Sequence, residues 1–166
     1  MRTRLFVAGF AALVAMAVTA VAAQSPAGQQ PAPAKAPAAP TPASCGPNPP
    51  ADMKNVAKGS RCFEMRTYVL RPGGKGDLNL LHARFRDKTL GFFKKHGFTV
   101  VGFWQPVSKP DTLIYILAFK DAAARDAAWA AFNADPDWLK VRNQDMVVDI
   151  TVTSEFMIAT DYGPIK

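Results

Sequence analysis

The chain has 166 residues, with 20 Lys and Arg against 13 Asp and Glu, and a formal net charge of +7. The positive charge is spread along the sequence and no nucleic-acid-binding motif accompanies it, so we expect no nucleic-acid partner. Two cysteines and two histidines at these spacings do not make a metal site, and no nucleotide fingerprint or phosphate loop is present, so we predict neither a metal nor a cofactor.

Residues 1–23 have the three-part pattern of a secretory signal peptide. Arg2 and Arg4 supply the basic start, and Leu5 to Val18 form an uncharged apolar run. The small residues Ala20 to Ala23 then precede the expected cleavage point. We expect cleavage and export, to the periplasm or to the medium. The alternative is an uncleaved anchor, because about 20 apolar residues can span a bilayer, and only in that case would the protein contact a membrane.

Residues 24–60 are predicted to be a disordered linker and approach segment. Of the 21 residues from Gln24 to Ser44, 13 are Ala or Pro, and such a composition cannot bury enough apolar surface to fold. Cys45 and Cys62 are the two cysteines of the chain. Because an exported protein meets an oxidising compartment, we expect them to form a disulfide that ties this segment to the folded part.

The remaining residues, 61–166, have the length of one domain. Alternation of apolar and polar residues predicts four strands, over residues 62–70, 98–107, 112–120 and 146–156. Periodic apolar residues behind aspartate caps predict two helices, over residues 77–96 and 121–134, with a short helical turn after Asp135. The order β-α-β-β-α-β predicts a ferredoxin-like α+β fold, in which a four-stranded antiparallel sheet carries both helices on one face.

The other face of this sheet would lie uncovered. Glu64, Arg66 and Tyr68 share one side of the first strand, and the apolar Phe63, Met65 and Val69 share the other. We assign the polar side to the uncovered face, together with further side chains from the other strands, Trp104, Tyr115, Asp149, Thr151 and Glu155. Because an open face with large aromatic side chains calls for a partner, we expect two copies to pack sheet against sheet as a homodimer. The alternative is a monomer with a solvated face.

The chain from about Arg61 to Lys166 resembles the NIPSNAP family. The resemblance is carried by the order and spacing of short segments, residues 63–68, 81–87, 95–98, 101–104, 113–118, 135–138, 156–157 and 159–164. It implies a dimeric α/β barrel, which agrees with the strand order argued above. The family has no settled enzymatic activity, so the resemblance implies a fold and not a reaction.

The candidate ligand-binding residues are Glu64, Arg66, Tyr68, His82, Trp104 and Tyr115. The first three would form a polar pocket between two sheets, or instead an ion pair that joins the subunits, with Glu64, Asp149 or Glu155 as the partner of Arg66. Trp104 and Tyr115 would wall this pocket or pack as interface core. His82 is either a switchable acid, base or ligand, or a solvated helix residue.

The sequence contains no Ser-His-Asp set or other recognisable catalytic group, so we predict no catalytic residue. Our leading hypothesis is a domain that binds a small organic ligand. The alternatives are a cofactor-independent enzyme of the oxygenase or isomerase type, and a protein-interaction module on a tether.

Overall fold

The computed structural model describes residues 44–166, and the predicted signal peptide and most of the Pro-rich linker lie outside them. The strands of this part are β1 (Cys62–Leu70), β2 (Thr99–Trp104), β3 (Thr112–Phe119) and β4 (Ile150–Ile158). Between β1 and β2 lie α1 (Leu78–Arg84), the π-helical turn η1 (Phe85–Thr89) and α2 (Leu90–Lys95). Between β3 and β4 lie α3 (Ala122–Ala134), α4 (Pro136–Lys140) and a second π-helical turn, η2 (Val141–Asp145).

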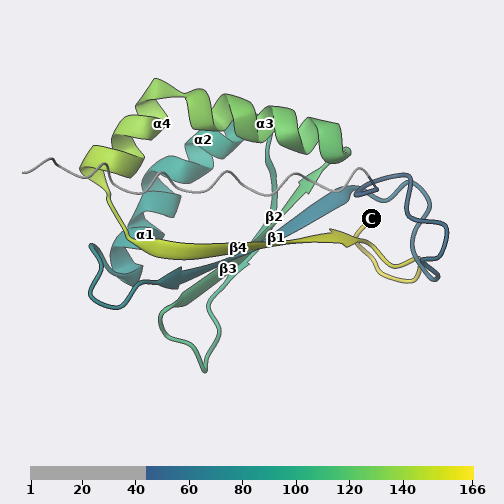
Figure 1. The fold of residues 1–166 in the computed structure, drawn as a ribbon, viewed down its shortest axis with the longest axis horizontal. Coiled ribbons are helices and arrows are strands. Elements are labelled where there is room, and N and C mark those ends of the chain that lie inside the picture. Colours follow the sequence, from purple (N-terminus) through teal and green to yellow (C-terminus); the bar gives the residue numbers. More distant parts are fainter. Residues whose placement is uncertain (1–43) are drawn as a thin grey trace, which may run out of the picture. The chain divides into compact units, whose positions relative to one another are not determined.

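The four strands form one antiparallel sheet in the order β2-β3-β1-β4. The helices lie along one face of this sheet (Figure 1). The predicted ferredoxin-like α+β fold is therefore confirmed. The last strand begins four residues later than predicted, because Asp149 binds the loop after β1 instead: its N–H donates to the carbonyl of Lys75 at 2.8 Å.

The helix predicted over residues 77–96 is interrupted by the π turn η1. A π turn adds a residue to the helical repeat and so shifts the buried side of the helix by one position. The buried side chains are consequently Leu81, Phe85, Thr89 and Phe93. A regular α-helical spacing predicts that Phe92 is buried in place of Phe93, but the Phe92 side chain is half-buried. The hydroxyl of Thr89 donates to the carbonyl of Arg84 at 3.1 Å and satisfies a carbonyl group within the turn.

The polar side of β1 faces the helices, which corrects the sequence-based assignment to the uncovered face. Glu64 is 0% exposed, and Trp129 of α3 donates to its carboxylate at 2.7 Å. Tyr115 pairs with Arg66 across the sheet and points to the same side. The rings of Tyr68 and Tyr115 lie 5.2 Å apart and fill the space beneath the helices. The side of β1 that lies under the helices is therefore the one with the large rings and the paired charges, although its residues are the more polar ones.

The uncovered face carries Met65 and the residues in register with it. Trp104 pairs with Ile114, Thr151 with Val69 and Glu155 with Met65, so these side chains lie on the uncovered face as predicted. Asp149 precedes β4, and its carboxylate accepts a hydrogen bond from the backbone N–H of Lys75 at 2.9 Å. It therefore belongs to the loop contacts and not to that face.

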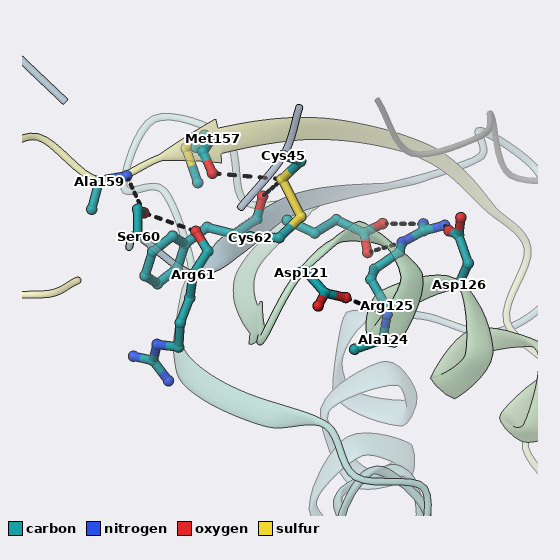
Figure 2. The surroundings of a disulfide bond; sticks show 12 residues. Cys45, Ser60, Arg61, Cys62, Asp121, Ala124, Arg125, Asp126, Met157 and Ala159 are labelled. Atoms are coloured by element: carbon teal, nitrogen blue, oxygen red, sulfur yellow. Dashed lines mark hydrogen bonds and ion pairs between the residues drawn. A yellow bond between two sulfur atoms is a disulfide. The ribbon is translucent and has the colours of Figure 1, made fainter. Parts of the chain in front are cut away.

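Residues 45–60, which form the approach segment before β1, are tied to the domain near both ends of that segment. Cys45 and Cys62 form the predicted disulfide, with Cα atoms 4.8 Å apart (Figure 2). Further along, Val56 forms a β-bridge with Thr160, and the N–H of Ala57 donates to the carbonyl of Ala159 at 2.8 Å. Across residues 44–166, no helix is long and apolar enough to cross a membrane.

Candidate functional site

The space between the sheet and the helices contains an unusual concentration of charged and polar side chains. We call it the interior polar cluster, and its members are Glu64, Arg66, Tyr68, Arg84, Tyr115, Arg125 and Trp129. All seven are buried. They come from β1, β3, α1 and α3, so the cluster joins the helices α1 and α3 to the two central strands of the sheet.

Glu64 is the centre of one half of the cluster. Its Oε1 accepts from Nη1 of Arg66 at 2.7 Å and from Nη2 of Arg125 at 2.8 Å. Its Oε2 accepts from Nε of Arg125 at 2.9 Å and from Nε1 of Trp129 at 2.7 Å. Burial alone would raise the pKa of Glu64, but the hydrogen bond from Arg125 and the charges of both arginines lower it overall. Glu64 is therefore a carboxylate whose two oxygens are fully used.

Arg125 also reaches outward from the cluster. Its Nη1 donates to Oδ1 of Asp126 at 3.1 Å, and Figure 2 shows the two side chains at the start of α3. The side chain of Asp126 is 52% exposed, so this carboxylate balances Arg125 only at the surface.

Arg66 has donors that the carboxylate does not use. Besides Glu64, its Nη1 donates to the hydroxyl of Ser154 on β4 at 3.0 Å. Its guanidinium carbon lies 4.4 Å from the centre of the Trp129 ring, a cation–π contact. Its Nε is buried and has no acceptor among the described residues.

Tyr68 and Tyr115 form a phenol pair beside these charges. The hydroxyl of Tyr115 donates to that of Tyr68 at 2.8 Å. Burial and the neighbouring phenol raise the pKa of Tyr115 well above its ordinary value, although the charge of Arg66 opposes this. Tyr115 is therefore protonated at neutral pH and acts as a donor.

Arg84 forms the other half of the cluster, at the end of α1. It is 4% exposed, and its Nη1 donates to the carbonyl of Met146 at 3.3 Å. Its Nε is buried without an acceptor in the part of the chain that the structure describes. Burial lowers the pKa of Arg84, and no carboxylate of residues 44–166 forms an ion pair with it.

The cluster therefore has a surplus of positive charge. Three buried arginines face one buried carboxylate, Glu64, and the half-exposed Asp126. A buried guanidinium N–H without an acceptor is rare and costly in a folded protein. The arrangement can donate the N–H groups of Arg66 Nε and Arg84 Nε to a polar group that enters from outside the chain.

Four of the six predicted candidates meet in this cluster, namely Glu64, Arg66, Tyr68 and Tyr115. Glu64, among the three carboxylates considered, is the partner of Arg66. The other two candidates are placed elsewhere by the fold. His82 Nε2 lies 3.3 Å from Oε1 of Gln105 in the loop after β2, and Trp104 is 49% exposed on the uncovered face.

Sequence reasoning missed Arg84 and Arg125. Arg125 interrupts an alanine-rich helix one turn before Trp129, and this spacing places both side chains on the same face. Arg84 directly precedes Phe85 on the buried side of α1. In each case a charged residue at a position of the buried helix face was the available signal.

Two surface hollows of the described part lie away from the cluster. The first, of about 430 Å³, lies between α3 and the strand ends and includes His96, Thr99, Lys120 and Ala127. The second, of about 360 Å³, lies beside Cys45 and the end of β4. Across residues 44–166, no three His, Cys, Asp or Glu side chains are grouped so that they could hold a metal ion.

Comparison with known proteins agrees with the predicted resemblance. The family model described as NIPSNAP matches residues 63–164, whereas no curated protein matches the chain. A NIPSNAP family protein of unknown function from Agrobacterium tumefaciens superposes with a TM-score of 0.55 at 22% identity, over 64% of this chain and 95% of that chain. A NIPSNAP-like domain protein from Burkholderia xenovorans superposes with a TM-score of 0.55 at 17% identity, over 63% of this chain and 90% of that chain.

A second NIPSNAP domain protein from Burkholderia xenovorans has a TM-score of 0.53 at 23% identity, over 62% of this chain and 98% of that chain. At these identities the superpositions show a shared fold alone. The family match, by contrast, extends over more than half of the chain, from the start of β1 to the C-terminal tail. The chain therefore belongs to the NIPSNAP family.

Proposed function

We propose that this NIPSNAP protein is an exported homodimer that binds a small organic molecule between its helices and its sheet, at the interior polar cluster. The proposal moves the ligand from the space between two sheets, where the sequence predicted it, to the interior of each subunit. The observation that carries the proposal is the pair of buried guanidinium N–H groups, Arg66 Nε and Arg84 Nε, that have no acceptor among the described residues.

The missing acceptors of these two N–H groups have an energetic cost. A buried donor without an acceptor costs about 1–3 kcal/mol, and a charged one costs more. A polar atom of a ligand would remove this cost and gain charge-assisted hydrogen bonds. The Tyr68–Tyr115 phenol pair and the rings of Phe85 and Trp138 lie near the two arginines and supply surface for an organic body.

Entry to the cluster requires a covering segment to move, because all of its side chains are buried and the two hollows described above are lined by other residues. Residues 146–149 are the segment we assign to this role. Met146 covers Arg84 through its carbonyl, and Asp149 exchanges two hydrogen bonds with Lys75 of the exposed loop after β1, at 2.8 and 2.9 Å. Opening would break these loop hydrogen bonds and would also expose Val148, which is buried in the core, so the open state is a minor one.

A second copy of the chain is the proposed partner of the uncovered face. The strand side chains of this face are apolar or uncharged except for Glu155, and include Met65, Thr67, Trp104, Ile114, Ile116 and Thr153. Arg61 lies over the Phe63 ring at one end of the face, before β1. The centre of the face can pack against its own copy, because a two-fold axis through it would not bring like charges together. Packing sheet against sheet would bury Trp104, which is 49% exposed in the single chain.

Export is supported by the disulfide between Cys45 and Cys62, because such bonds persist in oxidising compartments. The signal peptide itself lies outside the described residues. If the segment were retained, the Pro-rich linker would instead hold the domain near a membrane.

Native mass spectrometry of the protein purified from its own compartment tests the proposal. We expect a dimer of chains that lack the first 22 or 23 residues, each carrying one small molecule that denaturation releases. Arg66→Met should carry less of the molecule, whereas Arg86→Gln, which changes an exposed arginine next to the cluster's helix, should carry as much as the wild type. A wild-type dimer without any bound molecule would refute ligand binding and favour a tethered interaction module; a monomer would refute the dimer alone.

A cofactor-independent enzyme is a second candidate function, favoured by one observation. The phenol pair is buried beside the guanidinium groups of Arg66 and Arg84, and the hydroxyl of Tyr115 donates to that of Tyr68. Hydrogen-bonded phenols beside buried cations could stabilise negative charge that develops on a bound substrate. Incubation of the released molecule with the protein in air, followed by chromatography with mass detection, should show conversion if this function is correct, and Tyr115→Phe should slow it.

A further inference from the structure

We infer that the ligand is a small organic acid whose carboxylate binds at Arg84. This inference rests on the proposed function and adds the chemical class of the ligand. Arg84 carries the argument because it is the buried arginine of the cluster for which the described residues provide no carboxylate. Arg66 and Arg125, by contrast, share Glu64.

The charges around Arg84 favour an anion at this position. The one described hydrogen bond of its side chain goes to a neutral acceptor, the carbonyl of Met146, at 3.3 Å. A second cation, Arg142, also acts on it: burial lowers the pKa of Arg84, the phenols of Tyr68 and Tyr115 oppose this, and the charge of Arg142 lowers it further. Two like charges, one of them buried, are stable together when an anion lies between them.

The backbone on both sides of the Arg84–Met146 hydrogen bond is π-helical. Arg84 directly precedes η1, and Met146 directly follows η2, so the two π turns meet at the hydrogen bond between these residues. Single π turns are rare, are less regular than the α-helix, and often occur at functional sites. Their convergence on one arginine is an independent indication that this position is built for a ligand.

A carboxylate is the chemical group that best fits the surroundings of Arg84. A carboxylate accepts charge-assisted N–H bonds from a guanidinium edge, and Nε of Arg84 presents such an edge without an acceptor. The neighbouring surface is apolar and aromatic: the guanidinium carbon lies 6.0 Å from the centre of the Trp138 ring. A single carboxylate on an apolar or aromatic body matches this surface better than phosphate, whose double charge would need more donors in a dry site. The interaction is non-covalent, and no bond forms or breaks.

The test follows the arginine Nε–H signals of the mature, disulfide-bonded protein in 15N–1H NMR spectra. Acetate and benzoate are the probes, and acetamide and benzamide are their neutral counterparts. We expect both acids to shift the Arg84 Nε–H signal in a saturable manner, with benzoate the tighter binder, and the amides to have no effect. Arg84→Lys, which lacks the signal, assigns it.

Two substitutions and one control measure affinity. Arg84→Gln should weaken benzoate binding at least tenfold, and Arg142→Gln should weaken it severalfold. Arg86→Gln, on the exposed side of η1, should bind benzoate as the wild type does.

A stability measurement separates a binding role from a structural one. Because a buried charge without a counter-ion is costly, Arg84→Met should leave the Tm of the ligand-free protein unchanged or raise it. A structural arginine would instead lower the Tm by several degrees on removal. This measurement and Arg142→Gln remain informative if Arg84→Gln does not fold.

The results that overturn the inference are distinct from those that overturn the proposed function. Saturable binding of benzamide as tight as that of benzoate, or tighter binding of inorganic phosphate, would refute the carboxylate class and leave ligand binding in place. The absence of saturable binding by either acid would also refute it. Absence of binding by all these probes, together with native protein that carries no small molecule, would refute both.

Discussion

Nε1 of Trp129 lies 2.7 Å from Oε2 of Glu64, and this bond joins α3 to the central strand β1 through a carboxylate that is 0% exposed. The same carboxylate binds Arg125, one helical turn earlier on α3, and Arg66 on its own strand. The position of α3 on the sheet and the orientation of Arg66 therefore depend on one charge.

Glu64→Gln should lower the free energy of unfolding by about 3 kcal/mol, because it leaves the buried Arg66 without a counter-ion and Arg125 with only the half-exposed Asp126. Urea unfolding followed by tryptophan fluorescence measures the change. The matched control is Asp87→Asn, which changes an exposed carboxylate of η1 and should alter stability by less than about 0.5 kcal/mol. Equal effects of the two substitutions would contradict the assigned role of Glu64.

Stability should fall in acid, and Asp135 should account for part of the loss. Hydrogen bonds from Lys95 and then from His96, at 2.7 and 2.8 Å, hold the pKa of the Asp135 carboxyl well below its usual range. The pKa of Glu64 is lowered as well. Because the folded state binds protons at these two carboxylates less readily than the unfolded chain does, the stability that they provide is complete above about pH 5 and decreases as the pH falls below it.

Asp135→Asn tests this assignment. The oxygen of asparagine can still cap α4, where the Asp135 side chain accepts from the N–H groups of Asp137 and Trp138. We expect the variant to be less stable at pH 7 and to lose less stability between pH 5 and pH 2 than the wild type. An unchanged slope of unfolding free energy against pH would count against it, and Asp87→Asn should retain the wild-type slope.

The sequence was sufficient for the topology and insufficient for the interior. Alternation over the strands and the aspartate caps predicted the order of elements, because both depend on local geometry. The side of β1 that is buried depends instead on partners from a distant helix: Arg125 and Trp129 satisfy Glu64 only once α3 lies on the sheet. The π turn after Arg84 follows from packing in the same way, and it moved the buried ring from Phe92 to Phe93.

Reduction of the disulfide should destabilise the domain by about 3 kcal/mol, the value expected from loop entropy for a loop of this length. The bonded residues are 17 positions apart, and the side chains of Cys45 and Cys62 are buried. Thermal unfolding with and without dithiothreitol measures the effect. The variant with both cysteines replaced by alanine should unfold at one temperature in either condition; a wild-type protein insensitive to reductant would contradict a stabilising bridge.

Ile116→Glu should convert the proposed homodimer to a monomer, because it places a charge at the centre of the uncovered face, where a two-fold axis would bring it against the same charge of the second copy. Light scattering after size exclusion measures the mass. Lys88→Glu, on the exposed surface of η1, changes the charge by two units, against one unit for Ile116→Glu, but lies among the helices and should leave the protein dimeric. A wild-type monomer at micromolar concentration, or an unaffected dimer in Ile116→Glu, would refute this interface.

The decisive measurement is a crystal structure of the protein purified from its own compartment. We expect electron density for a small molecule between the helices and the sheet, with an oxygen within hydrogen-bond distance of Arg84 Nε, in each subunit of the dimer. An Arg84 Nε that instead binds an acceptor of the chain itself, in a closed interior with no further density, would contradict it.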